Sequence, residues 1–266
     1  MSESRKLSRL SIISLCVLVG LLLFGGYQVV TAKQQIGDDE FGSRVRAYLM
    51  SNPQVLREVI NELSAQEKMA AAADQKSLLT VHAKALKHDP ASYVAGNPDG
   101  DITIVEFFDY RCGYCKKSYP DVMKTVADDG NIRLVLKEFP ILGEQSILAT
   151  QAAIASIEQG KYIEFHDALM AARGSFSKEV ILGIASDVGL DIDKLQEDMQ
   201  KDSVRKIVED NYALAKQLGI NGTPAFIIGE HFVPGVLSIE QMKQLIASAR
   251  ESAAAADSNA DNDSKS

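Results

Sequence analysis

The sequence is poor in the residues that build metal clusters and disulfide-crosslinked folds. Its 266 residues include three cysteines and four histidines. None of the histidines has ligand spacing close to the cysteines, and a structural zinc site needs four ligands. Three cysteines are also too few for a framework of structural disulfides. The cysteines that are present are therefore expected to serve another purpose.

Clustered basic charge is absent as well. The formal net charge is −8, and because residues 1–32 carry a net charge of +2, the rest of the chain carries −10. A nucleic-acid-binding surface needs a basic patch or stripe, so no nucleic-acid partner is expected. A hydrophobic content of 46% is enough for a globular core. The length of the chain predicts one domain with extensions, or two domains.

The N-terminal segment, residues 1–32, has the composition of an export signal or a membrane anchor. Residues 1–9 are polar and basic, and residues 10–30 are mostly apolar. Val30-Thr31-Ala32 offers the small residues of a cleavage site, whereas the apolar stretch is long enough to span a bilayer. A cleaved signal and a retained anchor therefore both stay open. Either one predicts that the rest of the chain is periplasmic or otherwise extracytoplasmic.

Two of the cysteines form a Cys-x-x-Cys pair, Cys112 and Cys115, while Cys16 lies in the apolar N-terminal segment. Ile102–Phe108 predicts a strand buried on both faces, and Lys116–Asp128 predicts a helix. The pair thus lies where a strand becomes a helix. Unpaired N–H groups and the helix dipole stabilise an anion there. We predict that Cys112 is the ionised nucleophile and that Cys115 is the buried resolving cysteine.

Three further features accompany the pair. Pro120 lies inside the predicted active-site helix, where a proline kinks the backbone. Glu106 lies in the preceding apolar strand, and a buried carboxyl with a raised pKa could accept the proton of Cys115. Far along the chain, Gly222-Thr223-Pro224 leads into a short predicted strand. These residues add catalytic context to a common short motif.

This set of residues resembles the thioredoxin superfamily. The run Phe-Phe-Asp-Tyr-x-Cys-x-Tyr-Cys, residues 107–115, resembles the DsbA-like branch, particularly the helix-extended periplasmic proteins related to the suppressor-of-copper-sensitivity C protein. The resemblance covers residues 51–249. It implies an α/β thioredoxin fold with a DsbA-type helical insertion at about 143–200, preceded by an N-terminal helical extension. It also implies that Thr223 and Pro224 form a cis-proline loop that packs against the cysteines and offers backbone to the substrate.

The chain is expected to have four parts. They are the signal or anchor (1–32), a helical arm (33–90), the catalytic domain (91–250) and a disordered acidic tail (251–266). Amphipathic stripes run along the arm, and such a stripe packs either on its own domain or on other copies of the chain. The resemblance favours oligomerisation through residues 38–90, with docking on the catalytic domain as the alternative.

Further elements follow from periodicity and turn chemistry. They are short strands at 92–95 and 132–138, helices from 145 to about 200 and at 203–218, a hairpin at 225–233, and a final helix opened by a capping box at 238–241. His166 is predicted to be a surface residue of a helix. Tyr110 and Tyr114 fit equally well as packing residues and as substrate contacts.

The residues beside the cysteines suggest the direction of the chemistry. In this family, redox poise depends on the two residues between the cysteines, here Gly113 and Tyr114, and on the residue before the cis-proline, here Thr223. This combination resembles the DsbC-type isomerases more than DsbA. With Pro224, these residues are also the expected substrate contacts. The resemblance thus implies a thiol–disulfide oxidoreductase with isomerase capability and no cofactor, which acts on exported client proteins and is recharged by a membrane redox partner.

Two alternatives stay open. Within the same class, the chain could be a net disulfide oxidase of the DsbA kind, because the helical insertion is DsbA-like. In another class, it could be a non-catalytic surface or copper-handling protein in which Cys112 and Cys115 act as soft Cu(I) ligands.

Overall fold

The computed structural model describes residues 40–263, with side chains up to Ala255. The chain divides into two compact units, residues 1–70 and 71–266. The predicted signal or anchor lies outside the described residues. Among the residues that are described, no helix is long and apolar enough to cross a membrane.

The described part of the first unit is helical. Residues 40–51 form one helix, and α2 (Pro53–Val81) begins in this unit and ends in the second. Asn52 lies between the two helices and donates from Nδ2 to the Tyr48 carbonyl oxygen at 2.8 Å. A stripe of large apolar side chains remains exposed along both helices. Its members are Phe41, Val45, Tyr48, Leu56, Val59, Ile60 and Leu63.

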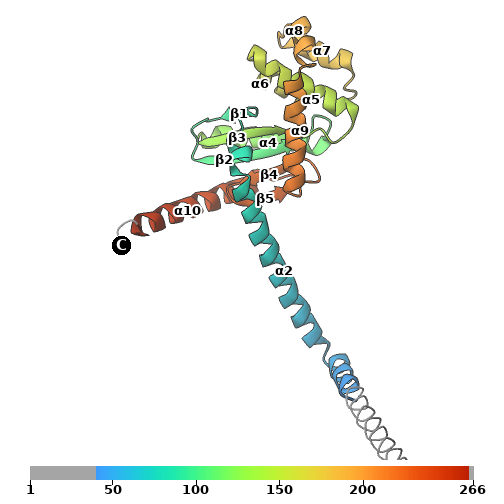
Figure 1. The fold of residues 1–266 in the computed structure, drawn as a ribbon, viewed down its shortest axis with the longest axis vertical. Coiled ribbons are helices and arrows are strands. Elements are labelled where there is room, and N and C mark those ends of the chain that lie inside the picture. The colour runs from blue at the N-terminus through green and yellow to red at the C-terminus, as the bar shows by residue number, and fades with distance from the viewer. Residues whose placement is uncertain (1–39, 264–266) are drawn as a thin grey trace, which may run out of the picture. The chain divides into compact units, whose positions relative to one another are not determined.

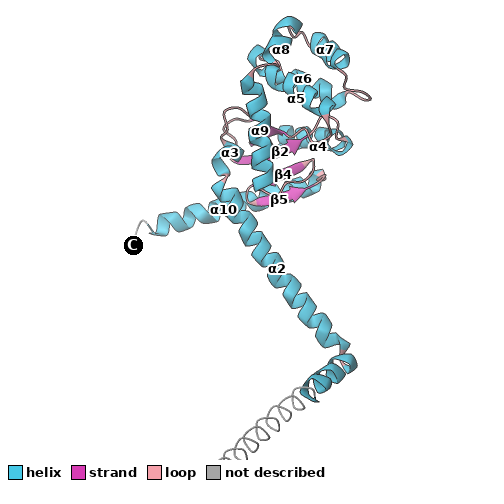
Figure 2. Cartoon of the chain, turned by 45° about the vertical axis from the view of Figure 1, so that its right-hand side comes forward, coloured by secondary structure: helices cyan, strands magenta, loops and turns pink. Residues whose placement is uncertain are grey.

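The second unit is built on a mixed sheet with strand order β1-β3-β2-β4-β5. Figure 2 draws β2, β4 and β5 of this sheet in magenta. The strands are β1 (Tyr93–Gly96), β2 (Ile102–Phe108), β3 (Ile132–Glu138), β4 (Ala225–Ile228) and β5 (His231–Pro234). β2 and β3 run parallel, whereas β1, β4 and β5 each pair antiparallel with their neighbours. The strand predictions and the hairpin at 225–233 are confirmed.

Apolar side chains cover both faces of the central strand β2. Ile104 and Phe108 pack into one hydrophobic cluster, while Val105 and Phe107 pack into another on the opposite face. Successive side chains of a strand point to opposite faces, so Glu106 shares its face with Ile104 and Phe108. The sequence predicted this double burial from the continuous apolar run.

Helices cover both faces of the sheet. α4 (Gly113–Asp129) and α10 (Ile239–Asp263) contribute to the cluster around Ile104, and α3 (Ala83–Lys87) and α9 (Asp202–Gln217) to the cluster around Val105. The predicted helical insertion comprises α5 (Glu144–Ser156), the 3-10 turn η1 (Ile157–Gln159), α6 (Tyr162–Ala171), α7 (Lys178–Asp187) and α8 (Ile192–Asp198). Figure 1 shows α5 to α8 gathered beyond one end of the sheet.

The last helix begins as predicted and ends later than predicted. Ser238 and Gln241 form a reciprocal capping box, with Gln241 N donating to Ser238 Oγ at 3.2 Å and Ser238 N donating to Gln241 Oε1 at 3.0 Å. The expected disordered tail at 251–266 is wrong over much of its length, because α10 continues to Asp263. Alanine has the highest helix propensity, and residues 253–256 are all alanine.

The division between the units falls earlier than the boundary expected at residue 90. Leu79 and Leu86 are buried in the cluster that includes Val105. The Asp89 carboxylate also accepts from the buried Lys137 Nζ at 2.6 Å. Residues 79–89 therefore contribute to the core of the second unit, and the arm expected at 33–90 does not form a separate unit over its whole length.

Candidate active site

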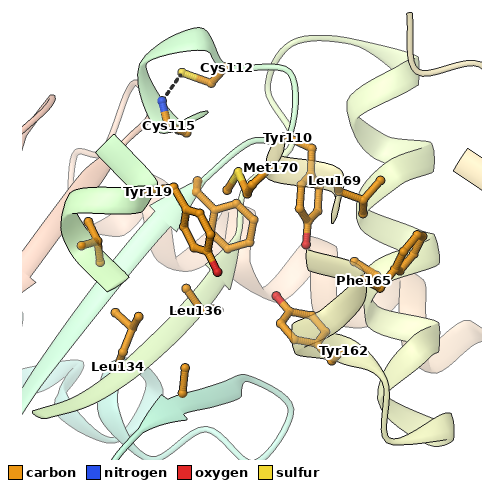
Figure 3. Close-up of a cluster of buried hydrophobic side chains, with 14 of the residues drawn as sticks. Tyr110, Cys112, Cys115, Tyr119, Leu134, Leu136, Tyr162, Phe165, Leu169 and Met170 are labelled. Carbon is orange, nitrogen blue, oxygen red and sulfur yellow. Dashed lines mark hydrogen bonds between the residues drawn. The ribbon is translucent and has the colours of Figure 1, made fainter. Parts of the chain in front are cut away.

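The two cysteines lie at the N-terminus of α4. Cys112 is the N-cap residue, and its Sγ accepts a hydrogen bond from the Cys115 backbone N at 3.5 Å (Figure 3). Both cysteines are free thiols in this structure. Pro120 lies inside the same helix. The strand-to-helix placement expected from the sequence is thus what the chain adopts.

The local environment lowers the pKa of the Cys112 thiol and raises that of the Cys115 thiol. The pKa of Cys112 is lowered to about 5, chiefly by a hydrogen bond from the Cys115 thiol and further by Thr223 and backbone N–H groups. The pKa of Cys115 is raised, first because its proton is held in that hydrogen bond and second because the residue is fully buried. The thiolate is the reactive form of cysteine, so this difference supports attack by Cys112 and resolution by Cys115.

The loop before β4 lies against Cys112. The Thr223–Pro224 peptide bond is cis, and the protonated Cys112 thiol donates to the Thr223 carbonyl oxygen at 3.2 Å. β4 pairs antiparallel with β2, with Ala225 opposite Phe107. This pairing brings the loop to the end of β2 from which the chain enters α4. The sequence-predicted loop residues and the cysteine are therefore neighbours in space.

Glu106 is fully buried beneath the pair. Neither carboxyl oxygen has a hydrogen-bond partner among the described residues. Burial raises the pKa of Glu106 to about 8, with a further contribution from the charge of Cys112. The charge of Glu106 in turn contributes to the raised pKa of Cys115. A carboxyl with this pKa is mostly protonated at neutral pH, yet it retains an ionised fraction that can take up a proton.

The residues between the cysteines face outward. Gly113 is exposed, and the Tyr114 side chain is 67% exposed. Of the two tyrosines that the sequence left undecided, Tyr114 is thus available to a substrate. Tyr110 is fully buried and serves packing.

A buried polar network, which the sequence did not reveal, joins the insertion to the sheet. The Glu138 carboxylate accepts from the hydroxyls of Tyr110 (3.0 Å), Tyr162 (2.8 Å) and Thr150 (2.9 Å). Figure 3 shows the hydroxyls of Tyr110 and Tyr162 pointing toward one another. His166 Nδ1 lies 2.9 Å from the Tyr110 hydroxyl. These contacts fix the loop before the cysteines against the insertion.

The prediction that His166 is a surface residue is wrong. Its side chain is fully buried, and burial lowers its pKa to about 3. The ring stacks on Tyr162, with centroids 5.6 Å apart. Its hydrogen-bond partner, Tyr110, lies 56 residues away in the sequence, so helical periodicity alone could not place it.

Asp109 is a second positioning residue that the sequence did not identify. Its carboxylate accepts from Arg111 N (2.7 Å), Leu142 N (3.0 Å) and Ser146 Oγ (2.8 Å). These bonds fix the loop that delivers Cys112 to the helix N-terminus. An aspartate three residues before a cysteine was the only available signal.

The described residues contain no group of three or more His, Cys, Asp or Glu side chains placed to hold a metal ion. The copper hypothesis therefore rests on the two sulfurs alone.

Two family models match the chain. Residues 103–247 match the DSBA-like thioredoxin domain, and residues 39–70 match the copper resistance protein ScsC N-terminal domain. The matches fall on the second and first units, respectively.

Solved structures and curated proteins are also similar to this chain. A thioredoxin-like oxidoreductase from Silicibacter pomeroyi DSS-3 is 45% identical, with a TM-score of 0.62, covering 63% of this chain and 97% of that chain. A linker-deleted variant of ScsC from Proteus mirabilis is 27% identical, with a TM-score of 0.63, covering 81% of this chain and 95% of that one. Na(+)/H(+) antiporter NhaA 1 of Salinispora arenicola is 32% identical over 161 residues, or 59% of this chain. This chain spans about a quarter of the length of that antiporter, since the match covers 24% of it.

Proposed function

The chain belongs to the DSBA-like thioredoxin domain family of thiol–disulfide oxidoreductases, and from that premise we propose that it exchanges disulfides with exported proteins through Cys112 and Cys115. The observation that carries the proposal is the opposite shift of the two thiol pKa values. The pKa of Cys112 is about 5, whereas that of Cys115 is raised. One sulfur is thus ready to attack, and the other keeps its proton until it is needed.

The first step is attack on a client disulfide. The Cys112 thiolate attacks one sulfur of the client disulfide, a bond forms between Cys112 and that sulfur, and the other client sulfur leaves as a thiolate. The cis-proline loop of Thr223 and Pro224 offers backbone to the client beside Cys112. Tyr114 and Gly113 are exposed next to the nucleophile and complete the proposed substrate contacts.

The mixed disulfide can resolve in two ways. In isomerisation, another client thiolate attacks the client sulfur bound to Cys112, so a new client disulfide forms and the Cys112 thiolate is released without net electron transfer. In reduction, Cys115 gives its proton to the ionised fraction of Glu106 and attacks the Cys112 sulfur. The client sulfur that was bound to Cys112 then leaves as a thiolate. A disulfide now joins Cys112 and Cys115, so the protein pair has been oxidised by two electrons. The reverse sequence oxidises a client dithiol.

We propose isomerisation as the main activity, with net oxidation as the alternative. Gly113, Tyr114 and Thr223 favour it through their resemblance to DsbC-type isomerases. The exposed apolar stripe of the first unit supports assembly of several copies, which would enclose a misfolded client. Net oxidation or reduction additionally requires a dithiol–disulfide redox partner, which we place in the membrane. The signal or anchor that the sequence predicts at residues 1–32 supports a periplasmic location.

The test is refolding of a client with scrambled disulfides, run beside a measurement of the reduction potential of the pair. The reduced protein is expected to restore client activity, and the Cys112→Ala variant is expected to have none. If the variant keeps the activity of the unmodified protein, the enzymatic proposal fails. An isomerase is expected to act on the scrambled client without added oxidant. Activity only on a fully reduced client, together with a strongly oxidising potential, would support the oxidase instead.

A further inference from the structure

A pocket of about 410 Å³ adjoins the nucleophile and is lined by positive charge. Arg111 and Gly113, the residues on either side of Cys112, both line it. Lys116, from the first turns of α4, and Arg173, from the loop after α6, add two more cations. No acidic residue lines this pocket.

In the described part of the chain, the side-chain hydrogen bonds of the three cations all go to neutral carbonyl oxygens, and Lys116 Nζ also lies 4.7 Å from the centroid of the Phe176 ring. Lys116 Nζ donates to the carbonyls of Leu169 (2.5 Å), Met170 (3.3 Å) and Ala172 (2.9 Å). Arg111 donates to the Leu142 carbonyl at 2.7 Å, and Arg173 donates to that of Met170 at 3.4 Å. These bonds hold the cations in place without neutralising them.

The cations that line the pocket repel one another, and no carboxylate among the described residues forms an ion pair with them. The pKa of Lys116 is lowered to about 8, first by burial and second by repulsion from Arg173. Asp109 acts on Lys116 in the opposite sense, but its carboxylate is buried and committed to the loop N–H groups and Ser146. By contrast, Arg250 elsewhere on the domain is paired with two aspartates. A carboxylate entering the pocket would relieve the repulsion, and arginine binds carboxylates with two parallel hydrogen bonds.

We propose that this pocket binds the carboxylate of an aspartate or glutamate that lies within a few residues of the client's reacting cysteine. The ligand belongs to the client because the pocket shares its walls with the segment that carries Cys112. A client held by its sulfur at Cys112 would therefore place its neighbouring side chains beside Arg111 and Arg173. The pocket would select clients with acidic residues next to their cysteines. This inference rests on the proposed function and names the substrate preference of the same site.

The test compares two peptides with the full oxidised protein. Both contain one cysteine and are identical except that aspartate in one replaces asparagine in the other, two positions from the cysteine. The rate of reaction of each reduced peptide with the Cys112–Cys115 disulfide is measured at low and high salt. At low salt the aspartate peptide is expected to react about two- to fivefold faster, as for a partly exposed ion pair. The preference should shrink as salt screens the charges.

Two variants test whether the faster reaction of the aspartate peptide depends on this pocket. Arg173→Gln is expected to remove most of it, whereas Arg205→Gln, which removes an exposed arginine of α9, should leave it intact. Equal rates for the two peptides with the unmodified protein would overturn the pocket proposal. Reaction with neither peptide would instead count against the proposed function.

A third substrate tests whether the pocket recognises a small thiol that carries its own carboxylate instead of a client side chain. Reduced glutathione is offered to the same oxidised proteins. If Arg173→Gln slows the reaction with glutathione but leaves the peptide preference unchanged, the pocket serves small thiols and the proposal is overturned. Loss of the peptide preference in Arg173→Gln supports it.

Discussion

Replacing Cys112 with serine should destabilise the reduced protein by an amount that depends on pH. The pKa of Cys112 is about 5 in the folded protein, against about 8.5 for an unperturbed cysteine. Because the folded-state pKa is the lower one, ionisation stabilises the folded state fully above about pH 8.5. This stabilisation is lost as the pH falls through 5. Serine does not ionise in this range, so the variant lacks this contribution at every pH.

The size of the effect follows from the pKa difference. One pKa unit corresponds to about 1.36 kcal/mol. Neutral pH lies about two pH units above the folded-state pKa of Cys112. It also lies below the unfolded-state pKa of about 8.5. The thiolate therefore stabilises the reduced protein by about 2–3 kcal/mol at pH 7. Near pH 4 the contribution falls to about zero, since the thiol is protonated in both states.

Urea unfolding of the reduced proteins measures this difference. The free energies of unfolding of the unmodified protein and of Cys112→Ser are compared in reducing buffer at several pH values from about 4 to 8. Cys115→Ser is the matched control, because serine keeps a hydroxyl donor toward Cys112. This control should retain most of the pH dependence. A difference between the unmodified protein and Cys112→Ser that stays constant across the whole range would refute the reasoning.

Four further predictions concern Glu106, Leu86 and the helical arm. Glu106→Gln cannot take up the proton of Cys115, so the mixed disulfide with a client should persist roughly tenfold longer or more in quenched reactions; an unchanged lifetime would exclude the carboxyl as acceptor. Since the pKa of Glu106 is raised to about 8, the unmodified protein should also lose stability relative to Glu106→Gln as the pH rises from about 4.5 through 8, as urea unfolding can measure; a gain would contradict the sign. Leu86→Ala removes a fully buried side chain and should lower the free energy of unfolding of the second unit by about 3 kcal/mol, whereas a residue in a free arm would cost almost nothing. The chain that begins at Lys33 should show an oligomeric mass in solution and the chain that begins at Ala71 a monomeric one; a monomeric mass for each chain would reject oligomerisation through the arm.

The sequence predicted the elements whose cause is local. The continuous apolar run at 102–108 produced the central strand, and the turn at Gly229-Glu230 produced the hairpin. Ser238 and Gln241 form the capping box that their spacing indicates. The position of Cys112 at the start of a helix also followed from the change of periodicity on either side of it. In each case the determining residues lie within one turn or one strand of one another.

The features that the sequence missed depend on partners distant in the chain. His166 is buried because it meets Tyr110, 56 residues away. Glu138 is satisfied by hydroxyls from 12 to 28 residues away, and no periodicity records such a meeting. Leu86 belongs to the catalytic core because it packs in the same cluster as Val105, while the composition of its segment resembles that of the exposed arm. Tertiary packing decided all three.

The proposed mechanism depends most on the acidity of the Cys112 thiol, which direct titration measures. The ultraviolet absorbance of the thiolate is followed as a function of pH in the reduced protein, with Cys112→Ser as the blank. The structure leads us to expect an ionisation midpoint of about 5 for Cys112. A midpoint at or above about 8.5, the value of an unperturbed cysteine, would contradict the account.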